Sequence, residues 1–160
     1  MKHKIIHVEG LPGGPVEFWG FEEERGKEKI PQLFVSHTTA DAGFIKTELM
    51  NLLPPLGILP AYLNQSMRLV GKAYKKTVLQ VMYSTQWFSV LLSPGSVESQ
   101  WVRFEVDWAF KNRPHETVIP ILMEACDYNE LHPKLCGLEL VDYTLGREIA
   151  QIVLLRKLGK

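Results

Sequence analysis

The sequence predicts an α/β fold, a three-layer sandwich in which a five-stranded parallel sheet lies between helices and follows an N-terminal β-hairpin. Two features of the 160-residue chain predict the sandwich. From residue 31 onward, short apolar runs alternate with longer stretches whose apolar residues recur at helical spacing. The short runs are apolar almost without interruption, which is typical of strands buried on both faces of a parallel sheet. The length suits one domain with its own core.

The first 30 residues predict a β-hairpin and a linker. Residues 4–8 and 16–21 have the composition of two short strands, and residues 10–15 between them are rich in glycine and proline. Residues 22–29 are almost wholly charged, which is typical of a solvated linker. We therefore divide the chain into residues 1–30, the hairpin and linker, and residues 31–160, the main domain.

Strands and helices alternate through the main domain. The predicted strands are residues 33–36, 57–62, 87–93, 118–122 and 138–143. The predicted helices are residues 41–53, 71–83, 100–111 and 145–158. Thr38 or Thr39 is suited to cap the first helix, and Pro54 with Pro55 ends it. The apolar positions of the last helix are Ile149, Ile152, Val153 and Leu155. Five strands connected in this way fit the flavodoxin-like order 2-1-3-4-5.

Composition excludes several classes of function. Eighteen basic side chains balance eighteen acidic ones, so the total charge predicts binding neither to nucleic acid nor to an anionic membrane surface. No apolar run reaches the roughly 18 residues of a membrane span, and the N-terminus lacks the apolar stretch of a signal peptide. Cys126 and Cys136 fit no zinc pattern and favour a reducing compartment over a disulfide. We expect a cytoplasmic protein.

Polar segments follow three of the predicted strands. Residues 36–39, 62–66 and 93–96 each come after a strand, and the carboxyl ends of parallel strands share one edge of the sheet. Trp101 and Glu105 stand four residues apart in the helix that follows the third of these segments, which places a ring and a carboxylate on one helix face. A single carboxylate beside a flat ring suits cleavage of a sugar–base bond.

Other motifs of this fold class are absent. The chain has no glycine-rich dinucleotide fingerprint and no phosphate-binding loop. A receiver domain needs acidic residues after its first strand and an aspartate after its third, where this chain has Ser36-His37 and Ser93-Pro94. The five histidines show no metal-ligand spacing, so we expect no metal site.

A further pattern runs through the main domain. Residues 33–37 (Leu-Phe-Val-Ser-His) are a short strand that ends in Ser-His, and residues 38–42 lead from it into a helix. In residues 91–101 a serine precedes a tryptophan by two positions at the exit from the third strand, and Glu105 follows Trp101 by four. Together these segments resemble a Toll/interleukin-1 receptor (TIR) domain of the bacterial, NAD-cleaving type. They resemble the first sequence box of that family in its bacterial variant, the exit from its third strand, and the motif whose glutamate is catalytic in the NAD-cleaving members. The similarity extends from residue 32 to about residue 158.

The resemblance implies an NAD+ glycohydrolase or cyclase with Glu105 as the catalytic residue. The bond between nicotinamide and ribose breaks without protonation of the leaving group, so the second carboxylate of ordinary glycosidases is dispensable. Glu105 would stabilise the positive charge on the ribose. NAD+ is then a substrate, and no cofactor is needed. The residues suited to bind it are Trp101, Phe34, Ser36, His37, Thr38, Asn64 and Ser66.

Two other functions fit the same residues. A TIR domain that only assembles with other TIR or effector proteins would catalyse nothing. A nucleoside deoxyribosyltransferase-like enzyme also uses one glutamate against a sugar–base bond. The chain departs from the family at residues 62–71, where Asn64 replaces a frequent acidic residue and the Arg-Asp and Pro-Gly pairs of animal receptors are missing. We expect self-association through TIR–TIR contacts and a role in bacterial defence or signalling.

Overall fold

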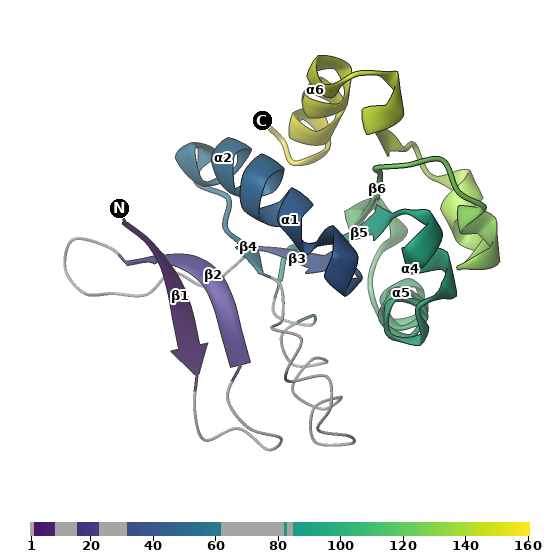
Figure 1. Cartoon of the computed structure of the whole chain (residues 1–160), viewed down its shortest axis with the longest axis horizontal. Helices are drawn as coiled ribbons and strands as arrows, with labels where there is room; N and C mark the ends of the chain where they lie inside the picture. The colour runs from purple at the N-terminus through teal and green to yellow at the C-terminus, as the bar shows by residue number, and fades with distance from the viewer. Residues whose placement is uncertain (1, 9–15, 23–31, 62–81, 83–84) are drawn as a thin grey trace. The chain divides into compact units, whose positions relative to one another are not determined.

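A computed structural model describes residues 2–8, 16–22, 32–61, 82 and 85–160. The chain divides into two compact units. The first comprises Met1–Phe34 and Ile45–Gln86, and the second comprises Val35–Phe44 and Trp87–Lys160. The second unit holds most of the residues that the sequence predicts to be functional. Figure 1 shows the elements of the whole chain.

The N-terminal strands form the predicted hairpin pairing. β1 (Lys2–Val8) and β2 (Val16–Glu22) are antiparallel, with Lys2 opposite Glu22 and Val8 opposite Val16. The predicted turn at 10–15 and nearly all of the predicted linker lie outside the described residues. The boundary between residues 30 and 31 stays a prediction.

The main sheet has five strands in the spatial order β4-β3-β5-β6-β7, which is the predicted order 2-1-3-4-5. Each neighbouring pair whose register is defined runs parallel. The strands are β3 (Leu33–Ser36), β4 (Pro60–Ala61), β5 (Trp87–Leu92), β6 (Val118–Leu122) and β7 (Val141–Asp142). The residues of β3 and β6 are all buried, as a sheet covered on both faces requires.

Two strands are shorter than predicted, because residues 57–59 and 138–140 are not in strands and Tyr143 belongs to a 3-10 turn. β4 was expected over 57–62, but a 3-10 turn at Pro54–Leu56 precedes it and Gly57 adopts φ +83°. β7 was expected over 138–143, but it lies between 3-10 turns at Pro133–Gly137 and Tyr143–Leu145. Only Val141 and Asp142 therefore pair with β6.

The first predicted helix, residues 41–53, is a chain of short helical pieces. The pieces are a 3-10 turn at Thr39–Asp41, α1 (Ala42–Phe44), a π-helical turn at Ile45–Leu49 and α2 (Met50–Leu52). The α-helix ends before Pro54 as predicted, yet the two prolines open a further 3-10 turn. The helix predicted over 71–83 lies outside the described residues except for Met82, which is helical and buried.

The segment after β5 folds into two helices where the sequence predicted one. The short α4 (Pro94–Glu98) begins at Ser93, and α5 (Gln100–Asn112) begins at Ser99, whose hydroxyl accepts a hydrogen bond from the Val102 amide. α4 and α5 contact each other, and both contact β5 (Figure 1).

The last helix, α6 (Arg147–Lys157), begins after Gly146, which adopts φ +132°. Ala150, Leu154 and Leu158 are buried, and α6 contacts β7. Of the apolar positions noted in the sequence, Ile149 and Ile152 are more than half exposed. No helix in the described part of the chain is long and apolar enough to cross a membrane.

Candidate functional site

The carboxyl end of β3 carries polar groups that are fully buried. Ser36 has no exposed surface and His37 is 1% exposed. The Nδ1 atom of His37 donates a hydrogen bond to the Val35 carbonyl at 2.9 Å, because a carbonyl oxygen only accepts.

A single carboxylate joins the segments that follow β3 and β5. Oδ2 of Asp41 accepts hydrogen bonds from the hydroxyls of Thr38, at 2.9 Å, and Ser93, at 2.6 Å. Thr38 is the N-cap residue of the 3-10 turn at Thr39–Asp41, but its hydroxyl donates to Asp41 and caps no backbone amide. Asp41 therefore fixes the two polar segments to each other at one edge of the sheet.

Ser93 is held on its other side by a capping box. Its backbone amide donates to the Ser96 hydroxyl at 2.8 Å, and its own hydroxyl accepts from the Ser96 amide at 3.3 Å. This arrangement sets the direction of α4, and through Ser99 that of α5. Sequence reasoning missed Asp41 and the capping box, although Thr38 with Asp41 and Ser93 with Ser96 both have the three-residue spacing of a helix N-terminus.

The hydroxyl of Ser36 has no hydrogen-bond partner among the described residues. A buried hydroxyl without a partner costs about 1–3 kcal/mol, so proteins satisfy almost all such groups. The Ser36 hydroxyl is such an exception, and it lies at the carboxyl end of β3. It is the position at which a ligand of a parallel α/β sheet binds.

Glu105 lies on the buried face of α5. Its side chain is 1% exposed, and it shares that face with Val102, Val106, Ala109 and Phe110. Burying an ionised carboxylate costs several kcal/mol, and glutamate is among the residue types least often fully buried. The acid therefore occupies a position at which packing alone would favour an apolar residue.

Trp101 precedes Glu105 by about one turn of α5, so the prediction that both residues lie on the helix after the third strand of the main domain is confirmed. Trp101 is partly exposed, and its ring meets that of Phe104 edge to face, with 6.3 Å between the ring centroids. Phe34 is a buried residue of β3 and, two positions before Ser36, points to the same face of the sheet. Asn64 and Ser66 lie outside the described residues.

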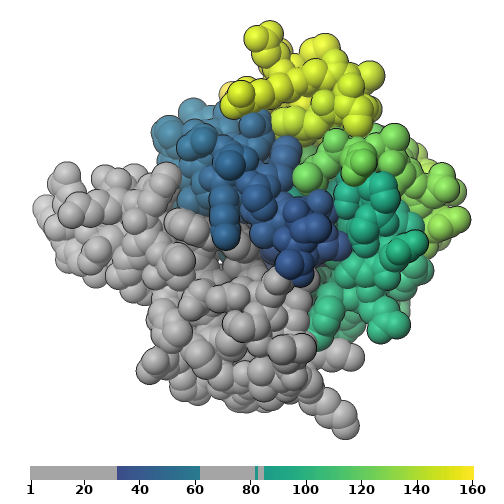
Figure 2. Space-filling model, viewed as in Figure 1, coloured from purple at the N-terminus to yellow at the C-terminus, as the bar shows by residue number. Residues whose placement is uncertain are grey.

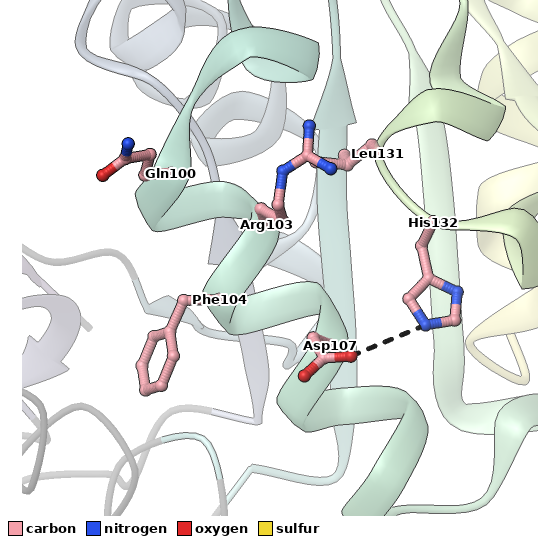
Figure 3. Close-up of a pocket in the computed structure, with 6 residues that line it drawn as sticks. All are labelled: Gln100, Arg103, Phe104, Asp107, Leu131 and His132. Atoms are coloured by element: carbon pink, nitrogen blue, oxygen red, sulfur yellow. Dashed lines mark ion pairs between the residues drawn. The ribbon is translucent and has the colours of Figure 1, made fainter.

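A pocket of about 380 Å³ lies on the outward side of α5 (Figure 3). It is lined by Gln100, Arg103, Phe104, Asp107, Leu131 and His132. Figure 3 shows Asp107 directed toward His132, whose Nε2 lies 3.9 Å from its carboxylate, while Gln100 and Phe104 extend from the other side of the helix. No predicted site residue lines this pocket. The buried acid and the strand-end hydroxyls lie elsewhere, so we place the candidate site with them.

Hydrogen bonds and burial hold the walls of that pocket. Arg103 donates to the carbonyls of Val97 and Glu130, each at 3.1 Å, which ties α5 to the 3-10 turn at Tyr128–Glu130. The His132 ring stacks on Phe110 with the centroids 4.4 Å apart. Burial lowers the pKa of His132 below the ordinary histidine value, and the nearby Asp107 carboxylate acts in the opposite direction.

Both cysteines carry free thiols, as the sequence predicted. Burial raises the pKa of the Cys126 thiol, and the carboxylates of Asp127, Glu124 and Asp41 raise it further. The thiol therefore stays protonated near neutral pH and is a poor nucleophile. Within the described ranges, no three His, Cys, Asp or Glu side chains are grouped to hold a metal ion.

Comparisons with known proteins agree on the fold. A family model described as TIR domain matches residues 33–155, a range that includes both strand ends and α5. Among solved structures, the TIR domain of the Toll-related receptor TRR-2 from Hydra magnipapillata superposes with a TM-score of 0.63 at 15% sequence identity. The match covers 80% of this chain and 98% of the Hydra chain. No functionally curated protein matches.

Proposed function

The chain belongs to the TIR domain family, and on that premise we propose that it cleaves the bond between nicotinamide and ribose in NAD+. The catalytic residue in this proposal is Glu105. NAD+ is the substrate, and the chemistry needs neither a cofactor nor a metal ion.

The burial of Glu105 carries the proposal. A residue that served only to pack α5 against the sheet would be apolar, because an apolar side chain avoids the cost of desolvating a carboxylate. Buried acids gather at functional sites, where a low dielectric strengthens their interaction with a developing positive charge.

The reaction follows from that charge. The glycosidic bond breaks with its electron pair moving to the pyridinium nitrogen, so nicotinamide leaves as a neutral base and the ribose becomes an oxocarbenium cation. The Glu105 carboxylate stabilises this cation. Water then attacks the ribose carbon and loses a proton, which gives ADP-ribose. Attack by a nitrogen of the adenine base gives a cyclic ADP-ribose instead.

The strand-end residues would supply the binding contacts. The buried Ser36 hydroxyl offers a donor for a ribose or phosphate oxygen, and we assign the buried His37, next to it in the chain, to the same binding surface. Trp101 presents a partly exposed ring on which a flat base can stack. We assign Phe34 and Thr38 to the same site, together with Asn64 and Ser66, which lie outside the described residues.

The setting that we propose is the cytoplasm, where NAD+ is abundant and thiols stay reduced. Self-association through TIR–TIR contacts, and contacts with other TIR or effector proteins, would link NAD+ cleavage to bacterial defence or signalling.

Chromatography of the products tests the proposal. The full chain is incubated with NAD+ at high protein concentration, and we expect nicotinamide together with an equal amount of ADP-ribose or its cyclic form. Intact NAD+ under all conditions would instead favour a module that acts only by assembly. Release of free base from deoxynucleosides, with NAD+ untouched, would favour a deoxyribosyltransferase-like enzyme.

A further inference from the structure

The pocket on the outward side of α5, which we call the α5 pocket, is formed by two segments of the chain. It has a volume of about 380 Å³ and is lined by Gln100, Arg103, Phe104, Asp107, Leu131 and His132. Figure 2 shows the two segments side by side at the surface, with the one that contains α4 and α5 in teal and the one after β6 in green. None of the residues that we assign to NAD+ lines this pocket, so its polar groups have no role in the proposed reaction.

Arg103 brings a positive charge to the α5 pocket that no carboxylate offsets. Its Nη1 and Nη2 atoms donate to the carbonyls of Glu130 and Val97, which are neutral backbone groups. In the described part of the chain, no Asp or Glu side chain lies within ion-pair distance of its guanidinium. An arginine has five N–H donors, and two of them are used here. The guanidinium is therefore held in place and retains donors for an oxyanion.

His132 offers a second donor from the other wall of the pocket. Its Nδ1 atom accepts a hydrogen bond from the Lys134 amide at 3.2 Å, so the neutral ring carries its proton on Nε2. Nε2 lies 3.9 Å from the Asp107 carboxylate, which is beyond hydrogen-bond distance (Figure 3). Stacking on Phe110 fixes the ring. A ligand oxygen can therefore accept a hydrogen bond from Nε2 without displacing an existing one.

Positive charge predominates around the α5 pocket. Asp107 is the one acid among its lining residues, and its Oδ2 atom is already paired with Nζ of Lys111 at 2.8 Å. The pKa of His132 is lowered first by burial, is raised by Asp107, and is lowered again by Lys134 and Lys111, so both lysines lie close enough to act on the ring. An anion in the pocket would be stabilised by these cations.

The size and the apolar surface of the α5 pocket indicate what the anion carries. A volume of about 380 Å³ lies in the range of sites for small organic molecules and is larger than an inorganic oxyanion needs. Phe104 and Leu131 contribute apolar surface to the lining, and the Phe104 ring is partly exposed. A ligand that fills the pocket therefore has an apolar or planar body as well as a charged group.

We propose that the α5 pocket binds a small organic anion, a molecule with a phosphate or carboxylate group on a planar or apolar body. Arg103 supplies the charge for the oxyanion, and His132 supplies a further donor. The body lies against Phe104 and Leu131. This site does not depend on the proposed reaction, because neither Glu105 nor a strand-end residue takes part.

NMR titration of the isotope-labelled full chain tests the pocket with four simple probes. Phenyl phosphate and benzoate combine a charge with a ring, whereas inorganic phosphate has only the charge and benzyl alcohol only the ring. We expect saturable shifts centred on the amides of residues 100–107 and 128–134. At least one of the two ring-bearing anions should bind at least about tenfold more tightly than inorganic phosphate and benzyl alcohol. The tighter of the two identifies the charged group.

Two substitutions separate the charge of the site from its apolar wall. Arg103→Gln removes the charge, so phenyl phosphate and inorganic phosphate should both bind at least about tenfold more weakly. Phe104→Ala removes the ring, so phenyl phosphate should lose most of its advantage, while the affinity for inorganic phosphate stays within about twofold. Arg147→Gln, at an exposed position on α6, makes the same change of charge away from the pocket and is the control. Circular dichroism checks that each variant is folded.

Three results would overturn the inference. The first is affinity for phenyl phosphate that does not change in a folded Arg103→Gln. The second is a set of shifts centred outside the α5 pocket, and the third is benzyl alcohol bound as tightly as both ring-bearing anions. Should Arg103→Gln fail to fold, Phe104→Ala still decides, because an unchanged preference for phenyl phosphate over inorganic phosphate in that variant would equally contradict the proposed site.

Discussion

Trp101 could serve to pack against Phe104 or to stack on the substrate, and a comparison with Phe104 distinguishes these two roles. The two rings meet edge to face, a contact worth about 1 kcal/mol beyond the area it buries. Trp101→Ala and Phe104→Ala both remove this contact, so both variants should lose comparable stability. Only Trp101→Ala should also lower NAD+ cleavage, by about tenfold or more, because only Trp101 is proposed to stack on the substrate.

Urea unfolding and nicotinamide release measured on the same samples give the comparison. Equal activity in the two alanine variants would assign Trp101 to packing alone. An unfolded Trp101→Ala beside a folded Phe104→Ala would lead to the same conclusion.

The two cysteines should differ in reactivity. Cys136 is exposed, whereas Cys126 is partly buried with its pKa raised first by burial and then by three neighbouring carboxylates. Alkylation proceeds through the thiolate, so we expect iodoacetamide to modify Cys136 well before Cys126 at neutral pH. Mass spectrometry of timed digests measures both rates. Faster modification of Cys126 would contradict the surroundings described for that thiol.

At the scale of elements, Asp41 holds the end of β3 to the end of β5. Asp41→Asn retains the size of the side chain but removes the charge that strengthens both hydrogen bonds from Thr38 and Ser93. We expect a loss of about 2 kcal/mol in the free energy of unfolding, since hydrogen bonds to charged groups contribute about 1.5–3 kcal/mol. Urea unfolding measures the loss, with the exposed Asp127→Asn as control. Equal stability of the two variants would show that the charge of Asp41 does not stabilise the fold through these hydrogen bonds.

The segment around His132 should make stability depend on pH. Burial lowers the pKa of His132, so the folded chain binds a proton less readily than the unfolded chain, whose histidine has a pKa near 6.5. This contribution is complete above pH 6.5 and is lost as the pH falls below that value. His132→Asn preserves an acceptor for the Lys134 amide and cannot titrate. Its unfolding midpoint should fall less between neutral pH and about pH 5 than that of the wild type. Parallel pH profiles would contradict the assignment.

Strands that form a continuous apolar run could be predicted from the sequence. β3 and β6 begin and end where predicted, because each is a continuous apolar run between polar or turn-forming residues. α4 could not be predicted, because five residues that include Pro94 and Gly95 carry no helical period. β4 and β7 were predicted too long, because an apolar run does not show which of its residues pair with a neighbouring strand.

The candidate site could be predicted only where it depends on residues that are close together in the sequence. Ser36, His37 and Glu105 could be proposed because strand ends and helix spacing are local features of the sequence, and all three side chains are buried. The hydrogen bond between Ser93 and Asp41 joins residues 52 positions apart, and no local pattern reveals it. The exposure of Ile149 and Ile152 was hidden as well, because the apolar residues of α6 point to both sides of the helix and periodicity alone does not choose the inner one.

For the whole molecule, the balance of charge should govern solubility. The formal net charge is zero at pH 7, and the isoelectric point is about 7.0. Repulsion between copies is weakest at the isoelectric point, so we expect the lowest solubility and the strongest association near pH 7. At about pH 8.5 the chain carries a net negative charge, so solubility should be higher and association weaker. Static light scattering across this range measures the trend. Association that strengthens as the pH rises would contradict it.

The most direct test of the central claim is the rate at which the full chain releases nicotinamide from NAD+, measured for the wild type and for Glu105→Gln. Glutamine matches glutamate in size, so circular dichroism and the unfolding midpoint should show the fold retained. We expect the rate to fall by about a hundredfold or more, because the charge that stabilises the ribose cation is gone. Glu98→Gln, an exposed acid on α4, should remain within about twofold of the wild type. An equal rate in Glu105→Gln and the wild type would contradict the assignment of Glu105 as the catalytic acid.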